Sequence, residues 1–282
     1  MARLQVTEPG TLLPFLIASL DGWARKTVKL RLKTGCVQVN GVSVTRHDHA
    51  LMPGDLVEVG ASTQPIARDP SALEILYRDA DLIVINKPAG LLSVGEATGN
   101  KEHALGLLRT QLSRPKHPLR LWPAHRLDRD TSGVLLFTTS LEMRKAVSQL
   151  WGEAEKIYLA VVEGHPDPDQ GTIDQPLWQD PVEYRMHVGP HPTAKEAITH
   201  FTTKQNAKKR SLLEIRIETG RQHQIRAHLA WLGHPIIGDP RYGRAGPRLG
   251  LHARRLTITH PETKKRLSFE IDAPDDFYGL VR

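Results

Sequence analysis

Residues 125–133, with the sequence HRLDRDTSG, constrain this chain more than any other stretch. They place two arginines, two carboxylates and two hydroxyls in one short polar segment, directly before the apolar run VLLF at 134–137. A polar loop that enters a buried strand is the usual way in which a rigid scaffold presents reactive side chains. The stretch therefore predicts a functional loop that ends on a core strand.

The charge balance of the chain favours a polyanionic partner. The 282 residues include 38 Lys and Arg against 31 Asp and Glu, a formal net charge of +7, and such an excess attracts polyanions. The basic residues are spread along the chain and form no amphipathic anchor, which favours nucleic acid over a membrane surface. No apolar run approaches the ~20 residues of a membrane helix, and the N-terminus lacks a signal-peptide pattern. We therefore expect a cytoplasmic protein.

The sequence gives little support to metal, redox or phosphoryl chemistry. Cys36 is the only cysteine, so neither an intramolecular disulfide nor a thiolate cluster can form within the chain. His223 and His228 share a predicted helix, but a spacing of five residues does not put both on one face. The chain also has no P-loop and no Gly-x-Gly-x-x-Gly turn. We expect neither a metal nor a cofactor.

The first 60 residues predict a small α/β domain. Apolar spacing and turn residues define its elements in order: helices at 12–20 and 25–32, a helix stop at Gly35, an alternating strand at 36–39, an Asn40-Gly41 turn and a strand at 56–59. Residues 61–72 are rich in Pro, Ser and Thr without an apolar period, which predicts a linker.

Residues 73–282 predict a second, larger domain. Its elements follow from periodicity and capping residues: strands at 82–85, 134–137, 156–164, 198–203, 212–218 and 267–271, with helices at 139–151, capped by Thr139 and Glu142, and at 219–232, capped by Thr219 and Gln222. The segment NKPAG at 86–90 predicts a turn, since proline fixes φ and glycine permits a left-handed residue. Strands outnumber helices at irregular spacing, so we predict an α+β fold with a mostly antiparallel or mixed sheet.

The larger domain resembles the RluA-type pseudouridine synthases, which isomerise uridine in RNA. The resemblance spans nearly the whole chain and rests on five segments: NKPAG, HRLDRDTSG, KIY at 156–158, TGRQHQIRAH at 219–228 and GHPIIGDPRYG at 233–243. It implies the pseudouridine synthase fold and isomerisation of specific uridines in structured RNA. The resemblance favours 23S ribosomal RNA as the target, with transfer RNA as the alternative.

The N-terminal domain resembles an S4-type RNA-binding domain, most closely over residues 33–59. Ala24 precedes the basic helix where that family usually has a serine. The resemblance implies that the basic face of the helix contacts RNA phosphates, through Arg25, Lys26, Lys29 and Lys33. A solvated helix face is the alternative.

The reaction itself calls for a carboxylate. The C1′–N1 bond must break and C5 must join C1′, and an electron-poor sugar carbon is the natural partner of an Asp or Glu. Asp128 and Asp130 are the candidates, and the resemblance assigns the role to Asp128. It also implies that Arg226 pairs with this carboxylate; by spacing alone, Arg226 could equally be a boundary arginine that reaches water. Attack on C1′, attack on C6 and a glycal route all stay open.

Three further residues are assigned roles, the first of them by the resemblance. Tyr158 is expected to pack against the flipped base, although a strand tyrosine is ordinarily core filler. Arg126, two residues before Asp128, is placed to enter the space that the base leaves, because a planar guanidinium can stack and hydrogen bond; an ordinary phosphate contact is the alternative. Arg221 is expected to support the fold or to contact a phosphate.

Two other functions remain open at this point. A non-catalytic RNA-binding or ribosome-assembly factor could keep the same scaffold, although the presence of Asp128, Tyr158 and Arg226 argues against it. A nucleosidase would release free uracil and need no folded RNA. We expect a monomer that acts on structured RNA.

Overall fold

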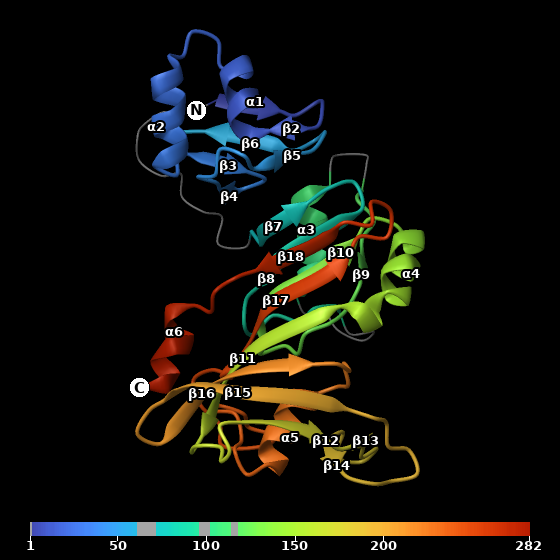
Figure 1. The fold of residues 1–282 in the computed structure, drawn as a ribbon. Helices are drawn as coiled ribbons and strands as arrows, with labels where there is room; N and C mark the ends of the chain where they lie inside the picture. The colour runs from blue at the N-terminus through green and yellow to red at the C-terminus, as the bar shows by residue number, and fades with distance from the viewer. Residues whose placement is uncertain (1, 61–71, 96–101, 114–117) are drawn as a thin grey trace. The chain divides into compact units, whose positions relative to one another are not determined.

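The computed structural model describes residues 2–60, 72–95, 102–113 and 118–282 (Figure 1). The chain forms two compact units: unit 1 contains Met1–Asn86, Ser93–Arg126 and Leu135–Arg144, and unit 2 contains Lys87–Leu92, Leu127–Val134 and Lys145–Arg282. Of the predicted linker at 61–72, residues 61–71 lie outside the described part. No helix in the described ranges is long and apolar enough to cross a membrane.

The N-terminal part of unit 1 contains two helices and a four-stranded sheet in the order β1-β6-β3-β4. Its elements are α1 (Leu12–Ser19), α2 (Arg25–Lys33), β1 (Ala2–Gln5), β3 (Val37–Val39), β4 (Val42–Ser43) and β6 (Leu56–Val59), with β2 (Gly10–Thr11) paired to β5 (Ala50–Leu51). The apolar faces of the helices meet the sheet, where Leu16, Val28 and Val57 are buried. Both predicted helices and the turn are confirmed, since Asn40 and Gly41 have positive φ values of 53° and 80°.

The rest of unit 1 is a hairpin with helices. It comprises β7 (Glu74–Arg78), β8 (Leu82–Lys87), α3 (Ala104–Leu112), β9 (Trp122–Pro123), the C-terminal part of β10 (Ser132–Thr138) and the start of α4 (Leu141–Gln149). The predicted cap of α4 is wrong by one residue. Ser140 Oγ accepts a hydrogen bond from the Met143 backbone N–H at 3.0 Å, whereas the Thr139 hydroxyl donates to the Ala80 carbonyl at 2.7 Å.

Unit 2 is built on a mixed sheet in the order β12-β15-β16-β11-β17, followed by the first residues of β10. Its strands are β11 (Glu155–Glu163), β12 (Gln170–Asp174), β15 (Ile198–Asn206), β16 (Arg210–Ile217), β17 (Leu251–Thr259) and β18 (Arg266–Glu270), and a small separate hairpin consists of β13 (Leu177–Gln179) and β14 (Met186–Val188). All pairings in the sheet of this unit are antiparallel except β10 with β17. The predicted α+β fold with a mostly antiparallel, mixed sheet is confirmed.

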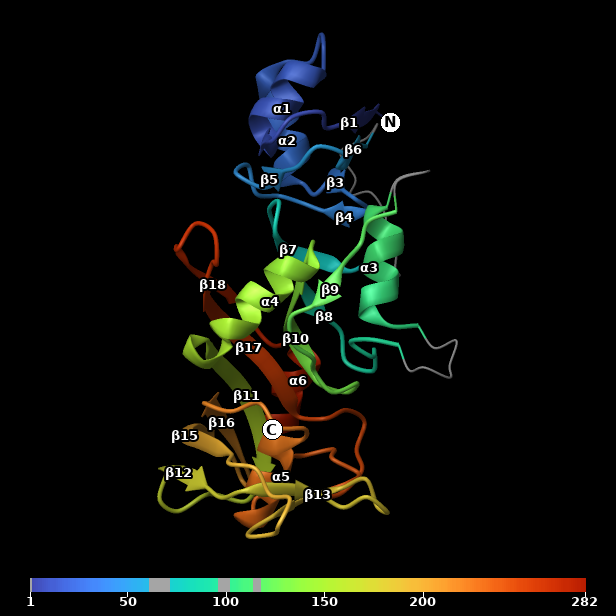
Figure 2. The same cartoon turned by 90° about the vertical axis from the view of Figure 1, so that its right-hand side faces the viewer.

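Alternate residues of β11 supply both faces of this sheet, as their period-2 pattern predicts. Ala160 and Val162 pack against the apolar side of α5 (Gln224–Trp231), which covers one face (Figure 2). Leu159 and Val161 pack on the other face against the C-terminal segment, which contains α6 (Asp275–Tyr278). The sheet of unit 2 is therefore covered on both faces at β11, which lies between α5 and the C-terminal segment.

Helix α5 begins five residues later than predicted. Its N-cap is His223, whose φ of 50° is left-handed, and the predicted Thr-x-x-Gln cap over 219–222 is wrong. Thr219 instead donates to Gln224 Oε1 at 2.8 Å, and the same oxygen accepts the Arg221 backbone N–H at 3.0 Å. This tight turn sets the direction in which the first residues of α5 point.

Candidate active site

The predicted functional loop is fixed where it enters β10. Gly133 has a φ of 115°, and a Cβ built on it would lie 2.1 Å from the Ala253 carbonyl oxygen of β17. Only glycine allows this approach, because any side chain would overlap the neighbouring backbone and would also strain the positive φ. The preceding residue is anchored as well, since Ser132 Oγ lies 2.9 Å from His252 Nδ1. Asp128 therefore projects from a loop whose end is locked to the sheet.

Asp128 pairs with Arg226, as the resemblance implied. Arg226 Nη1 donates to Asp128 Oδ2 at 2.9 Å, and the side chain of Asp128 is 20% exposed. The remaining donors of Arg226 face a residue that sequence reasoning missed: Nε and Nη2 donate to the two carboxylate oxygens of Asp239, at 2.7 and 2.9 Å. We refer to Asp128, Arg226 and Asp239 as the Asp128 cluster. Such a bidentate pair leaves the guanidinium little freedom to rotate.

Asp239 is the fully buried end of this cluster. Besides Arg226, its Oδ1 accepts the backbone N–H groups of Arg241 and Tyr242 at 2.9 and 3.2 Å. Burial opposes ionisation of Asp239, but the hydrogen bonds and positive charge of Arg226 outweigh it and lower the pKa of Asp239 below its ordinary value. Burial likewise opposes the charge on Arg226, and the two carboxylates nevertheless raise its pKa. The cluster is therefore charged, and Arg226 Nη1 is aimed at Asp128.

Tyr158 on β11 shares this environment. Burial, with a smaller contribution from the negative charge of Asp128, raises the pKa of Tyr158 well above its ordinary value. Its phenol is therefore protonated at neutral pH, and its hydroxyl forms no hydrogen bond with another described residue. Asp128, Tyr158 and Arg226 all belong to unit 2, where Arg226 contacts Asp128 and the charge of Asp128 reaches Tyr158.

His223 is a second neighbour that sequence reasoning missed. Its Nε2 lies 3.8 Å from Asp128 Oδ2, and its Nδ1 lies 3.1 Å from the Tyr242 hydroxyl. Burial first, and the charges of Arg226 and Arg241 in addition, lower the pKa of His223. From the sequence, His223 is considered only as a possible metal ligand on a helix. The left-handed N-cap conformation that turns it towards Asp128 has no signature in the local sequence.

Lys87 ties the NKPAG turn to the functional loop. Its ammonium is fully buried and donates to the carbonyl oxygens of Pro88, Leu91 and Arg129, at 2.9, 2.7 and 2.9 Å. Burial lowers the pKa of Lys87 to about 8, although Asp130 and Asp128 partly offset this effect. The predicted turn is present, with Gly90 at a φ of 84°, but the lysine also fixes the backbone one residue after Asp128.

Comparisons with known proteins agree with this geometry. Residues 81–231 match the family described as RNA pseudouridylate synthase. The chain belongs to this family. It is 35% identical to an uncharacterized RNA pseudouridine synthase of Bacillus subtilis, over 95% of the chain and 91% of that protein. It is 34% identical to the ribosomal large subunit pseudouridine synthase D of Neisseria meningitidis, over 99% of the chain and 81% of that protein.

Solved structures support the same conclusion. The human RNA pseudouridylate synthase domain containing 4 matches with a TM-score of 0.61 and 26% identity, over 73% of this chain and 91% of that one. The human RNA pseudouridylate synthase domain containing 1 matches with a TM-score of 0.58 and 27% identity, over 73% and 84%. The chain is thus an RNA pseudouridine synthase, an isomerase that acts on uridine in RNA.

The other residues singled out in the sequence of this synthase lie on the surface. Arg126 is exposed and belongs to unit 1. Arg221 is exposed, and its Nε donates to the Glu196 carbonyl at 2.9 Å. Asp130, the other candidate carboxylate, pairs with its neighbour Arg129 at 3.1 Å rather than with Arg226. The basic residues of α2 form an exposed row, Arg25, Lys26, Lys29 and Lys33.

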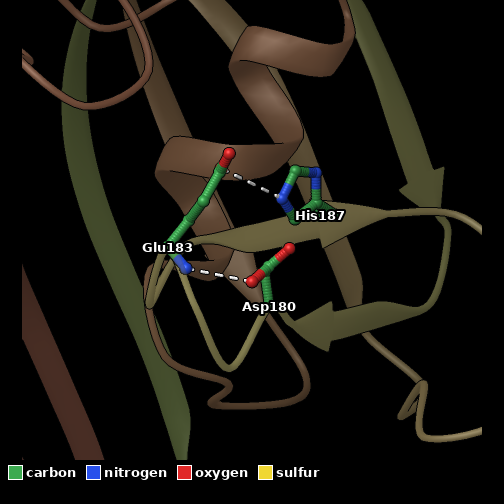
Figure 3. Close-up of side chains that lie close together, drawn as sticks. All are labelled: Asp180, Glu183 and His187. Atoms are coloured by element: carbon green, nitrogen blue, oxygen red, sulfur yellow. Dashed lines mark hydrogen bonds and ion pairs between the residues drawn. The ribbon is translucent and has the colours of Figure 1, made fainter.

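One group of side chains in the described part of the synthase has the spacing of a cation site (Figure 3). It consists of Asp180, Glu183 and His187 at the turn between β13 and β14. Asp180 Oδ1 accepts the backbone N–H groups of Val182 and Glu183 at 2.7 and 2.9 Å, and Glu183 is 60% exposed. These contacts are those of an ordinary capped turn, so we assign no metal to it.

Proposed function

We propose that this synthase isomerises specific uridines in large-subunit ribosomal RNA, with Asp128 as the catalytic carboxylate. The observation that carries the proposal is the Asp128 cluster, in which Arg226 is clamped by Asp239 and directs one donor at Asp128. The choice of RNA is supported by the relatives from Neisseria meningitidis and Escherichia coli, which are named ribosomal large subunit pseudouridine synthase D.

The carboxylate acts on the electron-poor carbon of the target nucleotide. The C1′–N1 bond breaks, the base turns, and C5 joins C1′; the proton lost from C5 is matched by the proton gained at N1, so no co-reactant is needed. An Asp128 oxygen either bonds to the electrophilic carbon or stabilises its positive charge. Arg226 keeps that oxygen oriented throughout.

Tyr158 holds the extruded base. Its ring offers a stacking surface that suits any pyrimidine. Because the pKa of Tyr158 is raised by burial and by Asp128, the phenol stays protonated in the resting enzyme and can donate a hydrogen bond to the base. Extrusion itself costs a few kcal/mol of stacking, and Arg126 offsets part of this cost by filling the vacated space with its planar guanidinium.

The N-terminal residues 1–60 bind the RNA outside the target nucleotide as an S4-like domain, and residues 73–282 form the catalytic domain. The exposed row on α2 contacts phosphates, and Arg221 contributes a further phosphate contact from unit 2. The enzyme works as a cytoplasmic monomer. The alternatives are a transfer RNA substrate and a non-catalytic role in ribosome assembly.

Mapping of pseudouridine across cellular RNA, with and without the gene, tests the proposal. We expect the loss of one or more pseudouridines from 23S ribosomal RNA, and their return when the wild-type gene, but not the Asp128→Asn variant, is restored. Loss confined to transfer RNA would replace the substrate. An unchanged map would favour the non-catalytic alternative.

A further inference from the structure

Unit 2 contains a pocket of about 530 Å³ that the proposed chemistry does not use. It lies where β11 ends and β16 begins, beside the loop that contains Arg244. The residues that give it its character are Glu163, His165, Lys208, Lys209, Arg210 and Arg244. We refer to this feature as the basic pocket, and its volume is in the range of ordinary ligand sites.

Positive charge dominates the basic pocket. Four cationic side chains line it against a single carboxylate, that of Glu163, among the described lining residues. Lys208, Lys209 and Arg244 are exposed, and none of them forms an ion pair with another described residue. Three neighbouring cations that form no ion pair with a described residue raise the local potential and attract an anion.

The backbone that presents these cations is held in place. The Gly164 backbone N–H donates to the Lys209 carbonyl at 2.8 Å, and Ser211 Oγ donates to the Gly164 carbonyl at 2.8 Å. Arg210 Nη1 donates to the Leu280 carbonyl at 2.8 Å, which ties the start of β16 to the C-terminal segment. Lys209 and Arg210 therefore extend from an anchored backbone at the start of β16, so less chain entropy is lost when a ligand orders them.

The basic pocket shares two elements with the active site. Glu163 lies five residues beyond Tyr158 on β11, which corresponds to roughly 17 Å at about 3.3–3.4 Å per residue. Arg244 lies in the same short loop as Asp239, and the Gly243 backbone N–H donates to the Asp239 carbonyl at 3.0 Å. A structured RNA engaged at Asp128 is long enough to reach such a distance.

We infer that the basic pocket binds a phosphodiester group of the substrate RNA, at nucleotides separate from the target uridine. The inference rests on the proposed function, because it takes the RNA bound at Asp128 as the source of the phosphate. Phosphate contacts fix the register of a nucleic acid on a protein without reading its bases. The pocket thus helps to determine which uridine reaches the active site.

The test is the triple variant Lys208→Gln, Lys209→Gln, Arg244→Gln. Its probe is a 23S ribosomal RNA transcript, and the measured quantity is the dissociation constant over a series of KCl concentrations. Each lost phosphate contact reduces the slope of log affinity against log salt by ~0.7–0.9, so we expect a reduction of roughly 2. Turnover at saturating RNA should stay at the wild-type level.

The matched control is Lys264→Gln, Lys265→Gln, Arg266→Gln, at the exposed β17–β18 turn of the same unit. It removes the same three charges, so an equal slope change in both variants would overturn the inference by reducing it to net charge. An unchanged slope in the pocket variant would also overturn it, including the case in which the pocket binds an acidic protein instead. Single Gln variants replace the triple if it does not fold. Failure of the wild-type enzyme to modify the transcript would instead count against the proposed substrate.

Discussion

The Asp128 cluster and the basic pocket hold their charges in opposite ways. In the cluster, Arg226 meets both carboxylates within hydrogen-bonding distance and Asp239 is fully buried. In the pocket, Lys208, Lys209 and Arg244 are exposed and have no ion-pair partner among the described residues. Buried charges with fixed partners are barely screened by salt, whereas exposed charges are strongly screened. Under the proposed function, we expect the cluster to set the rate of isomerisation and the pocket to set the affinity for RNA.

The sharpest test of this separation is Asp128→Asn. The amide keeps the size of the side chain but loses its nucleophilic charge, so we expect turnover to fall on the order of 10³-fold or more. RNA affinity and thermal stability should stay near wild type, because Asp128 contributes only one of three carboxylate contacts to Arg226. Single-turnover kinetics on a 23S ribosomal RNA transcript measures the effect, and near-normal turnover would refute the role of Asp128.

The second test, Asp239→Asn, should reduce stability as well as rate. It leaves Arg226 buried with half of its partners, and breaking a buried pair costs about 3–5 kcal/mol. Urea denaturation should show a loss of unfolding free energy in this range. Glu270→Gln is the control, since Glu270 pairs with Arg254 while 41% exposed, and exposed pairs contribute about 1 kcal/mol or less. Similar losses in the two variants would contradict the clamp.

The third test uses the pH dependence that Lys87 confers. Its pKa is about 8 in the folded protein against an ordinary value of 10.5, so between these values the unfolded chain binds the proton and the folded one does not. The unfolding free energy of the wild type should therefore rise with pH in this window relative to Lys87→Met, by up to about 3 kcal/mol at 1.36 kcal/mol per pH unit. Below pH 8 the difference between the two proteins should be constant. Parallel stability curves of the two proteins from pH 7 to 10 would disprove the lowered pKa of Lys87 in the folded protein.

The smallest effect on turnover and stability is expected from the exposed row on α2. Replacing Arg25, Lys26, Lys29 and Lys33 by Gln should weaken binding of the same transcript and lower the salt slope by roughly 3, at ~0.7–0.9 per contact. Turnover at saturating RNA and unfolding free energy should change little, because these side chains are exposed on one helix face. A large loss of saturated turnover would place this row in the catalytic step and break the comparison.

The sequence predicted the fold where the pattern is local. Period-2 alternation located β11 and assigned its faces, and Asn40-Gly41 located the hairpin turn. The predictions failed at helix starts, because the competing cap residue lay one position away at Ser140 or required a left-handed conformation at His223. Such choices depend on contacts that a short window of sequence does not contain.

For the active site, too, the local motifs identified residues, but the contacts of Asp239 and Lys87 with distant residues were not predicted. The motifs identified Asp128 and Arg226, and the structure places the two side chains 2.9 Å apart. Asp239 lies within a segment quoted for the family resemblance, but only its distance to Arg226 reveals what it does. Lys87 reads as part of a turn, while its decisive contact is with the Arg129 carbonyl 42 positions further along the chain. Partners joined through the fold leave no periodic signal.

Gly133 limits how this enzyme can diversify. Because a Cβ at this position would overlap the Ala253 carbonyl of β17, a mutation to any other residue would displace the loop that carries Asp128. New substrate preferences must therefore arise at neighbouring exposed positions, such as Arg129. In a library randomised over 126–133, survivors selected for activity would keep glycine at 133 and aspartate at 128, while Arg129 drifts.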